Sequence, residues 1–159
     1  LMAMHIERSG IKLAAIYRPL NNQYLNPIME KIRKKYICKI QIKKGISGTK
    51  DLLKYFKLGT SIALMIDQRV SEGVRSKFFG KEALTTTIPA QFVKKFNCKI
   101  IPIHILRKAD NNFKLKVFKP LQFSKNESIE TITLSLNSIL EKMINENPSQ
   151  WIWTHNRWK

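Results

Sequence analysis

Residues 61–67, Ser-Ile-Ala-Leu-Met-Ile-Asp, form a continuous, mostly apolar run that ends at an acid. A short run of this kind predicts a strand that is buried on both faces in a parallel sheet. The preceding residues, 49–58, place Leu52 and Phe56 on one face of an expected helix. Because a helix followed by a buried strand is half of a βαβ unit, the stretch predicts an α/β fold.

Strands and helices are expected to alternate along the rest of the chain. Further strands are expected at 12–17, 37–42, 99–106 and 113–118, and further helices at 26–36, 88–96 and 127–147. This order predicts one α/β domain over residues 1–159, with a mainly parallel or mixed sheet and flanking helices. Asn26 and Pro27 fit an N-cap and the first helical position. Pro102 favours an edge position or a bulge in its strand. Residues 68–87 form a long connection, which in compact domains tends to be functional or mobile.

The chain is strongly basic. Lys and Arg number 29 against 11 acidic residues, a net charge of +18, which favours nucleic acid, anionic lipid headgroups or an acidic carrier protein as partner. Ten basic residues lie between Lys31 and Lys57 against one acid, Asp51. This face is either solvated or lies on an anionic bilayer. Phe78, Phe79 and the three Trp residues either anchor such an interface or fill the core.

Several common chemistries are missing from the sequence. It contains no G-x-S-x-G elbow, Walker loop, H-E-x-x-H pair or G-x-G-x-x-G loop. Cys38 and Cys98 lie far apart in no metal-type spacing, which indicates two reduced thiols and no metal site. No apolar run approaches the roughly 18 residues of a spanning helix.

A few polar residues stand where ligands can bind. Asp67 follows the expected buried strand, and ligands of open α/β sheets bind at that edge, although Asp67 could equally cap a loop. Arg18 follows another strand, and Pro19 stiffens its turn, so it either presents a bidentate fork to an anion or stays solvated. His104 is interpreted as a satisfied core residue. His155, among Trp and Arg residues, is either functional or structural.

Four blocks of the chain resemble the lauroyl- and myristoyl-type late acyltransferases of lipid A biosynthesis. They are Tyr17-Arg18-Pro19-Leu20-Asn21-Asn22; Asp67-Gln68 with Gly73, Phe78-Phe79-Gly80 and Thr85-Thr86-Thr87; Ile101-Pro102; and Pro148, Gln150-Trp151, Trp153, His155 and Arg157-Trp158-Lys159. Their shared order and spacing make the resemblance specific, and it covers essentially the whole chain.

The resemblance implies a glycerolipid acyltransferase-like fold and a transfer reaction. An acyl chain moves from acyl carrier protein to a hydroxyl of the lipid A precursor, an acylated glucosamine disaccharide, at the cytoplasmic face of the bacterial inner membrane. No cofactor is implied, because the carrier-borne acyl donor is itself a substrate. Carrier protein, lipid A precursor and the anionic membrane surface are the implied partners, and nucleic acid is not one.

The family also shares a His-x4-Asp/Glu motif, in which the carboxylate orients a His that acts as general base. His5 does not form it, because Ser9 and Gly10 follow where an acid is needed. The motif is therefore expected directly upstream of Leu1, and residues 1–10 resemble the last turns of a helix. Both observations predict an N-terminally truncated piece that holds no catalytic residue and is inactive alone.

The resemblance implies that the chain contributes substrate-binding residues. They are Arg18, Asp67, Gln68, His155, Arg157 and Lys159. Arg18 would bind an anionic group such as phosphate, Asp67 and Gln68 would shape the site, and the other three would lie near the site or the headgroups. Two alternatives stay open: an acyltransferase for another glycerolipid or glycolipid acceptor, and a non-catalytic basic binding module. A nucleic-acid module is disfavoured because the aromatic residues cluster in a loop and the tail.

Overall fold

The computed structural model describes residues 1–158, apart from the side chains of Ile46 and Ser47. The chain divides into an N-terminal unit, Leu1–Met65, and a C-terminal unit, Ile66–Lys159. No helix in the described part of the chain is long and apolar enough to cross a bilayer. The expectation of one acyltransferase domain over residues 1–159 stays a prediction.

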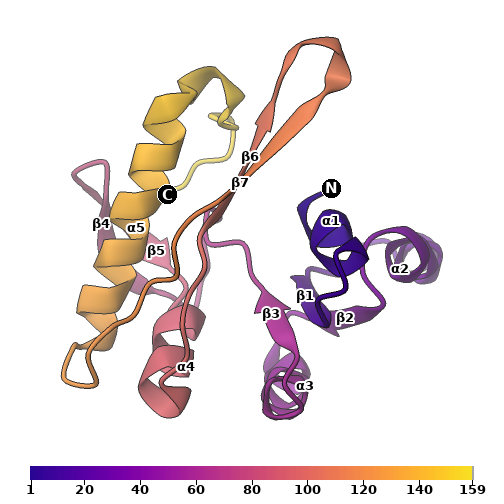
Figure 1. Cartoon of the computed structure of the whole chain (residues 1–159), viewed down its shortest axis with the longest axis horizontal. Helices are drawn as coiled ribbons and strands as arrows, with labels where there is room; N and C mark the ends of the chain where they lie inside the picture. The colour runs from indigo at the N-terminus through magenta and orange to yellow at the C-terminus, as the bar shows by residue number, and fades with distance from the viewer. Residues whose placement is uncertain (159) are drawn as a thin grey trace. The chain divides into compact units, whose positions relative to one another are not determined.

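A small parallel sheet organises the N-terminal unit (Figure 1). Its elements are α1 (Met2–Arg8), β1 (Leu13–Tyr17), α2 (Leu25–Tyr36), β2 (Ile40–Lys43), α3 (Ile46–Lys57) and β3 (Ser61–Ala63). The strand order is β2-β1-β3, and Ala14 of the central strand pairs in parallel with Ile40 and Ile62. Gly48 lets the first turn of α3 approach the Lys43 carbonyl closely, because a Cβ there would collide with it. The predicted α/β class is confirmed.

The strand expected at 61–66 is shorter and more exposed than its apolar sequence predicts. Only Ser61–Ala63 pairs, and it pairs with β1 alone at the edge of the sheet. Ser61 is exposed, and the two residues after it are half-buried. The expectation of a strand buried on both faces is therefore wrong, because no residue of β3 is fully buried.

Two helices of the N-terminal unit begin earlier than expected. Helix α2 begins at Leu25 rather than at Pro27, because Asn22 takes the capping role expected of Asn26. Asn22 Oδ1 accepts hydrogen bonds from the Tyr24 and Leu25 amides, at 2.9 and 3.1 Å. Asn26 Oδ1 instead accepts from the Leu20 amide. Helix α3 begins at residue 46, three residues before the expected start at 49. Both errors are start-point errors that leave the helices themselves in place.

The C-terminal unit combines two antiparallel hairpins with two helices (Figure 1). Its elements are β4 (Val74–Phe78), β5 (Lys81–Thr85), α4 (Ile88–Phe96), β6 (Ile103–Arg107), η1 (Ala109–Asn111), β7 (Phe113–Val117), α5 (Ile129–Glu146) and η2 (Pro148–Gln150). Strand β4 pairs with β5, and β6 pairs with β7. Ser128 caps α5 by accepting from the Thr131 amide at 3.1 Å. Ala90, Val93, Ile132 and Leu136 form the buried contact of α4 with α5.

The long connection expected at 68–87 is wrong, because most of it forms the β4–β5 hairpin. Phe79 and Gly80 connect the two strands with φ values of 49° and 74°. Positive φ at both central residues is the type I′ geometry that matches strand twist. A Phe at the first of these positions carries no usual turn signal, so the hairpin was not predicted.

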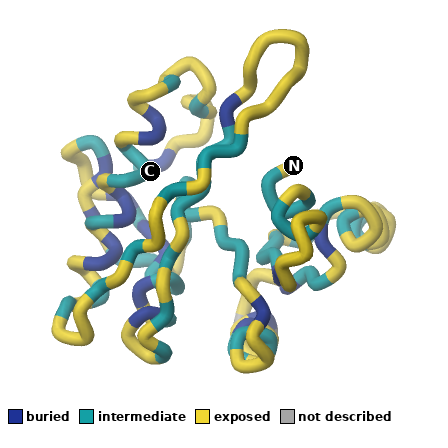
Figure 2. Tube along the Cα trace, in the orientation of Figure 1, coloured by how far each residue is buried: buried dark blue, intermediate teal, exposed yellow. Residues whose placement is uncertain are grey.

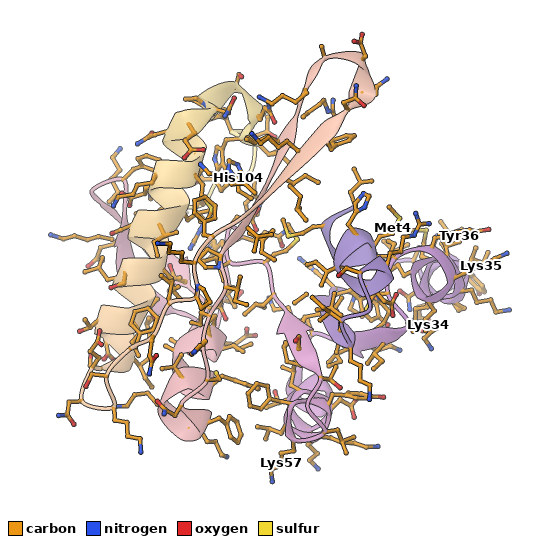
Figure 3. All side chains as sticks on the ribbon, viewed as in Figure 1. Met4, Lys34, Lys35, Tyr36, Lys57 and His104 are labelled. Carbon is orange, nitrogen blue, oxygen red and sulfur yellow. The ribbon has the colours of Figure 1, made fainter. Side chains whose placement is uncertain are left out.

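Two further expectations about this unit need correction. Strand β6 begins after Pro102, whose carbonyl accepts from the Phe118 amide, so the proline lies before the strand rather than within it. His104 is half-buried on β6 (Figure 3). Its buried Nδ1 has no hydrogen-bond partner among the described residues, so it is not a satisfied core histidine. Cys38 and Cys98 are free thiols, as the sequence predicts.

Candidate functional site

The C-terminal tail meets the segment that follows the apolar run. The Arg69 amide donates a hydrogen bond to His155 Nε2 at 3.4 Å. Two residues before Arg69, Asp67 buries its Oδ1 without a hydrogen-bond partner among the described residues. Burial raises the pKa of Asp67 above its ordinary value, while the charges of Arg157 and His155 act in the opposite direction. Residues almost ninety positions apart in sequence therefore share one electrostatic environment.

Arg157 holds the tail in place from inside the unit. Its side chain is fully buried, with 0% exposure. One guanidinium nitrogen donates to the Leu84 carbonyl, and the other donates to Thr85 Oγ1 at 2.8 Å. The guanidinium also lies over the Phe78 ring, 5.4 Å from its centroid. Burial lowers the pKa of Arg157 and the nearby Asp67 raises it, so the carboxylate offsets part of the cost of burying this charge.

A buried amide on α5 completes the support of Arg157. Asn137 Nδ2 lies within hydrogen-bond distance of Thr85 Oγ1 at 3.2 Å, Ser76 Oγ at 3.2 Å and the Lys77 carbonyl at 3.0 Å. Thr85 Oγ1 thus accepts from both Asn137 and Arg157 and donates to the Ala83 carbonyl. The network ties α5, the β4–β5 hairpin and the tail together.

Two tryptophans of the tail also pack against the hairpin. Trp158 Nε1 donates to the Phe78 carbonyl at 2.9 Å. The rings of Trp158 and Trp151 lie 5.7 and 6.1 Å from the Phe78 ring, between centroids. Beside them is an open depression of about 420 Å³ lined by Phe79, Lys81, Asn156 and Trp158. Trp151 and Trp158 therefore serve the core, whereas Trp153 is exposed.

Arg18 belongs to the N-terminal unit, where it is exposed directly after β1. The residue before it, Tyr17, donates its hydroxyl to Glu30 Oε1 at 2.7 Å. Lys43 lies 3.2 Å from the same carboxylate oxygen, and Arg33 lies over the Tyr17 ring, 4.9 Å from its centroid. The hydrogen bond from Tyr17 is the main cause that lowers the pKa of Glu30, followed by that from Lys43. These contacts fix the backbone from which Arg18 projects.

The family model of the bacterial lipid A biosynthesis acyltransferases matches residues 1–159. The chain belongs to this family. Membership implies acyltransferase activity in lipid A biosynthesis, with an acyl donor and a lipid A precursor as substrates. No curated protein matches the chain. The family recognised from the four sequence blocks is confirmed.

The site residues expected of such an acyltransferase fall into both units. Asp67, His155 and Arg157 come together in the C-terminal unit, and Gln68 is exposed in the bend after Asp67. Arg18 lies in the other unit, and Lys159 lies outside the described residues. Asp67 does not directly follow a strand, because pairing of β3 ends at residue 63. Their roles toward substrate stay predictions.

Sequence reasoning missed some of the residues that support the candidate site residues. Asn137 and Glu30 were not singled out, and Thr85 appeared only within the Thr85-Thr86-Thr87 block, with no supporting role assigned to it. Asn137 and Glu30 each left a signal. Asn137 is next to Leu136, a member of the apolar stripe of the 127–147 helix, and buried amides require partners. Glu30 is four residues from Asn26, which donates to it at 2.7 Å. No three His, Cys, Asp or Glu side chains that could hold a metal ion gather within the described part of the chain.

Proposed function

We propose that this chain supplies substrate-binding groups to a lipid A acyltransferase that uses an acyl carrier protein-borne donor. The acceptor is a hydroxyl of an acylated, phosphorylated glucosamine disaccharide. The observation that carries the proposal is the convergence of Asp67, His155 and Arg157 in a chain of this family. A glycerolipid acyltransferase-like fold belongs to the same proposal, supported by the parallel sheet β2-β1-β3.

The reaction needs a base that the printed sequence does not supply. The acceptor oxygen attacks the thioester carbonyl, a C–O bond forms, the C–S bond breaks, and the hydroxyl proton passes through a base to the leaving thiolate. Five positions after His5 and His104 stand Gly10 and Ala109, and neither is an acid. We therefore assign binding rather than proton transfer to the residues of this chain, and propose that it has no turnover by itself.

Asp67 is proposed to orient a sugar hydroxyl. Its buried Oδ1 has no partner among the described residues, and a carboxylate oxygen accepts hydrogen bonds from hydroxyl groups. Burial raises the pKa of Asp67, and the nearby charges of Arg157 and His155 partly offset this in favour of the ionised, accepting form. Gln68, exposed next to it, is available to contact the same substrate. His155 is itself exposed on the tail and can also reach solvent-borne groups.

Arg18 is proposed to bind a phosphate of the lipid. It is exposed at the carboxyl end of the central parallel strand, the edge at which open α/β sheets bind ligands. A guanidinium offers two parallel N–H donors that match phosphate oxygens. The surrounding excess of Lys and Arg suits both an acidic carrier protein and the cytoplasmic face of the inner membrane.

The direct test is binding of the detergent-dispersed lipid A precursor to the 159-residue chain, measured by calorimetry. We expect saturable binding that weakens at least ~10-fold in Arg18→Ala, because a charge-assisted phosphate contact is lost. Arg8→Ala, which removes an exposed arginine of α1, is the matched control. Binding that is absent, or unchanged in Arg18→Ala, contradicts the assignment.

Two comparisons separate the proposal from its alternatives. Lysophosphatidic acid replaces the precursor in a parallel titration, and tighter binding of it favours a glycerolipid acceptor. Acyl transfer is then measured with acyl carrier protein as donor. Turnover by the 159-residue chain would show that a base lies within it and would end the assignment of binding roles only.

A further inference from the structure

Helix α2 turns its polar side toward its own unit. Asn26, Met29, Glu30 and Arg33, spaced three and four residues apart, are its half-buried residues. Three of these four are polar, and each of the three has a partner: Asn26 donates to Glu30, Glu30 accepts from Tyr17, and Arg33 lies over the Tyr17 ring. The side that a surface helix normally buries is apolar, so the mostly polar inward side of α2 departs from the usual arrangement.

The apolar residues of α2 occupy the side of the helix next to this polar side. We call them the outer stripe: Leu25, Ile28, Ile32 and Tyr36, which are 51%, 55%, 41% and 54% exposed. Their spacing of three, four and four residues places them on one helical face. No residue of α2 is buried, and α2 is exposed along most of its length in Figure 2. A contiguous apolar stripe on a surface marks an interaction site.

Lysines accompany the outer stripe. Lys31, Lys34 and Lys35 are all exposed, and Figure 3 shows Lys34 and Lys35 projecting from α2. The helical spacing places Lys31 and Lys35 beside the stripe and Lys34 on the side away from it. The one acid of the helix, Glu30, is on the inner side and is already engaged by Tyr17. The stripe therefore presents apolar and positive groups with no competing carboxylate, which matches an anionic lipid surface in both respects.

We propose that the outer stripe of α2 is seated at the headgroup level of an anionic bilayer, with the helix axis along the membrane plane. The apolar side chains enter the acyl boundary, and the lysines contact lipid phosphates. This inference rests on the proposed function, whose substrate is a membrane lipid. The hydrogen bond of Tyr17 to Glu30 fixes α2 beside the start of the Arg18 turn, so seating the helix brings Arg18 toward the headgroups.

The test is co-sedimentation of the 159-residue chain with two kinds of vesicle. One is phosphatidylcholine alone, and the other is phosphatidylcholine and phosphatidylglycerol in equal parts. We expect binding to the anionic vesicles and at least ~10-fold weaker binding of the double variant Ile28→Gln with Ile32→Gln. Leu134→Gln is the control, because Leu134 of α5 is 42% exposed, much like Ile32, but lies in the other unit.

Four results would overturn the proposal. The first is unchanged vesicle binding of the double variant, and the second is equal binding of the wild type to neutral and anionic vesicles. The third is a melting temperature several degrees lower in the double variant. The fourth is a wild-type dimer that the double substitution converts to a monomer. The third would mean that protein covers the stripe, and the fourth that a second copy does. Binding of the detergent-dispersed precursor is expected to stay unchanged in this variant, so failure of the proposed function is seen separately.

Discussion

Helices α2 and α5 both carry an apolar stripe of helical period in the sequence. In the structure α5 buries its stripe, whereas α2 leaves its stripe exposed. Helix α5 buries Ile132, Leu136 and Met143 along one face, which Figure 2 shows as recurring buried positions. Helix α2 buries none of its residues, and its half-buried side is polar. The apolar stripe of α5 therefore serves folding, whereas that of α2 is free for another surface.

The inward sides of the two helices also differ in how many polar contacts they make. Asn137 of α5 is a buried amide on a face that is otherwise apolar except for Thr133, and its partners lie on the β4–β5 hairpin. On α2, polar contacts replace the apolar ones: Glu30 accepts from both Tyr17 and Asn26. The comparison teaches that a stripe of period 3.6 identifies a helix, while the contacts of its polar residues decide which side faces inward.

The largest expected effect comes from shortening one isoleucine in each helix. Ile132→Ala in α5 should lower the free energy of unfolding by roughly 3 kcal/mol, because it leaves a cavity beside Ala90, Val93 and Leu136. Ile32→Ala in α2 should change it by less than about 0.5 kcal/mol, because Ile32 is exposed. Urea unfolding followed by circular dichroism measures both. Equal losses would mean that the two stripes are both buried.

A smaller effect is expected from replacing one arginine in each unit by lysine. Arg157→Lys should cost about 2 kcal/mol, because one ammonium cannot serve the Leu84 carbonyl and Thr85 Oγ1 together. Arg33→Lys should cost less than about 1 kcal/mol, since the half-exposed Arg33 mainly stacks on Tyr17. Thermal unfolding of the two variants gives the comparison. A larger loss in Arg33→Lys would place the firmer polar network on α2 instead.

Local patterns predicted much of the fold. The helix at 88–96 was predicted with the bounds of α4, and the long apolar stripe located α5 to within two residues. Both succeed because periodicity and helix ends are local properties of the sequence. The β4–β5 hairpin was missed because Phe79, rather than Asn or Gly, occupies a positive-φ position of its turn.

The sequence identified residues of the candidate site but not the residues that hold them in place. The four sequence blocks identified Asp67, His155 and Arg157 as members of one family pattern. That Arg157 would be fully buried, on Thr85 and Leu84, depends on contacts more than seventy residues apart in sequence. Composition and periodicity carry no information about such pairings, so the burial of an arginine expected near the site or the headgroups could not be predicted.

The most subtle difference between the units is in two carboxyl groups whose pKa values shift in opposite directions. Burial raises the pKa of Asp67, so its contribution to stability is present below the ordinary Asp pKa and is lost as pH rises through the raised value. The hydrogen bond from Tyr17 lowers the pKa of Glu30, so its contribution is present above the ordinary Glu pKa and is lost as pH falls through the lowered value.

The variants Asp67→Asn and Glu30→Gln should therefore differ from the wild type with opposite pH slopes. Between about pH 3 and pH 7, the melting temperature of Asp67→Asn should rise relative to the wild type, because a buried charge no longer forms. That of Glu30→Gln should fall over the same range, because the ionised acceptor of Tyr17 is missing. Asp51→Asn, on the exposed side of α3, supplies the background of removing a surface carboxylate. A falling slope for Asp67→Asn would mean that attraction by Arg157 and His155 outweighs burial, and Asp67 would then be an ordinary ion-paired carboxylate.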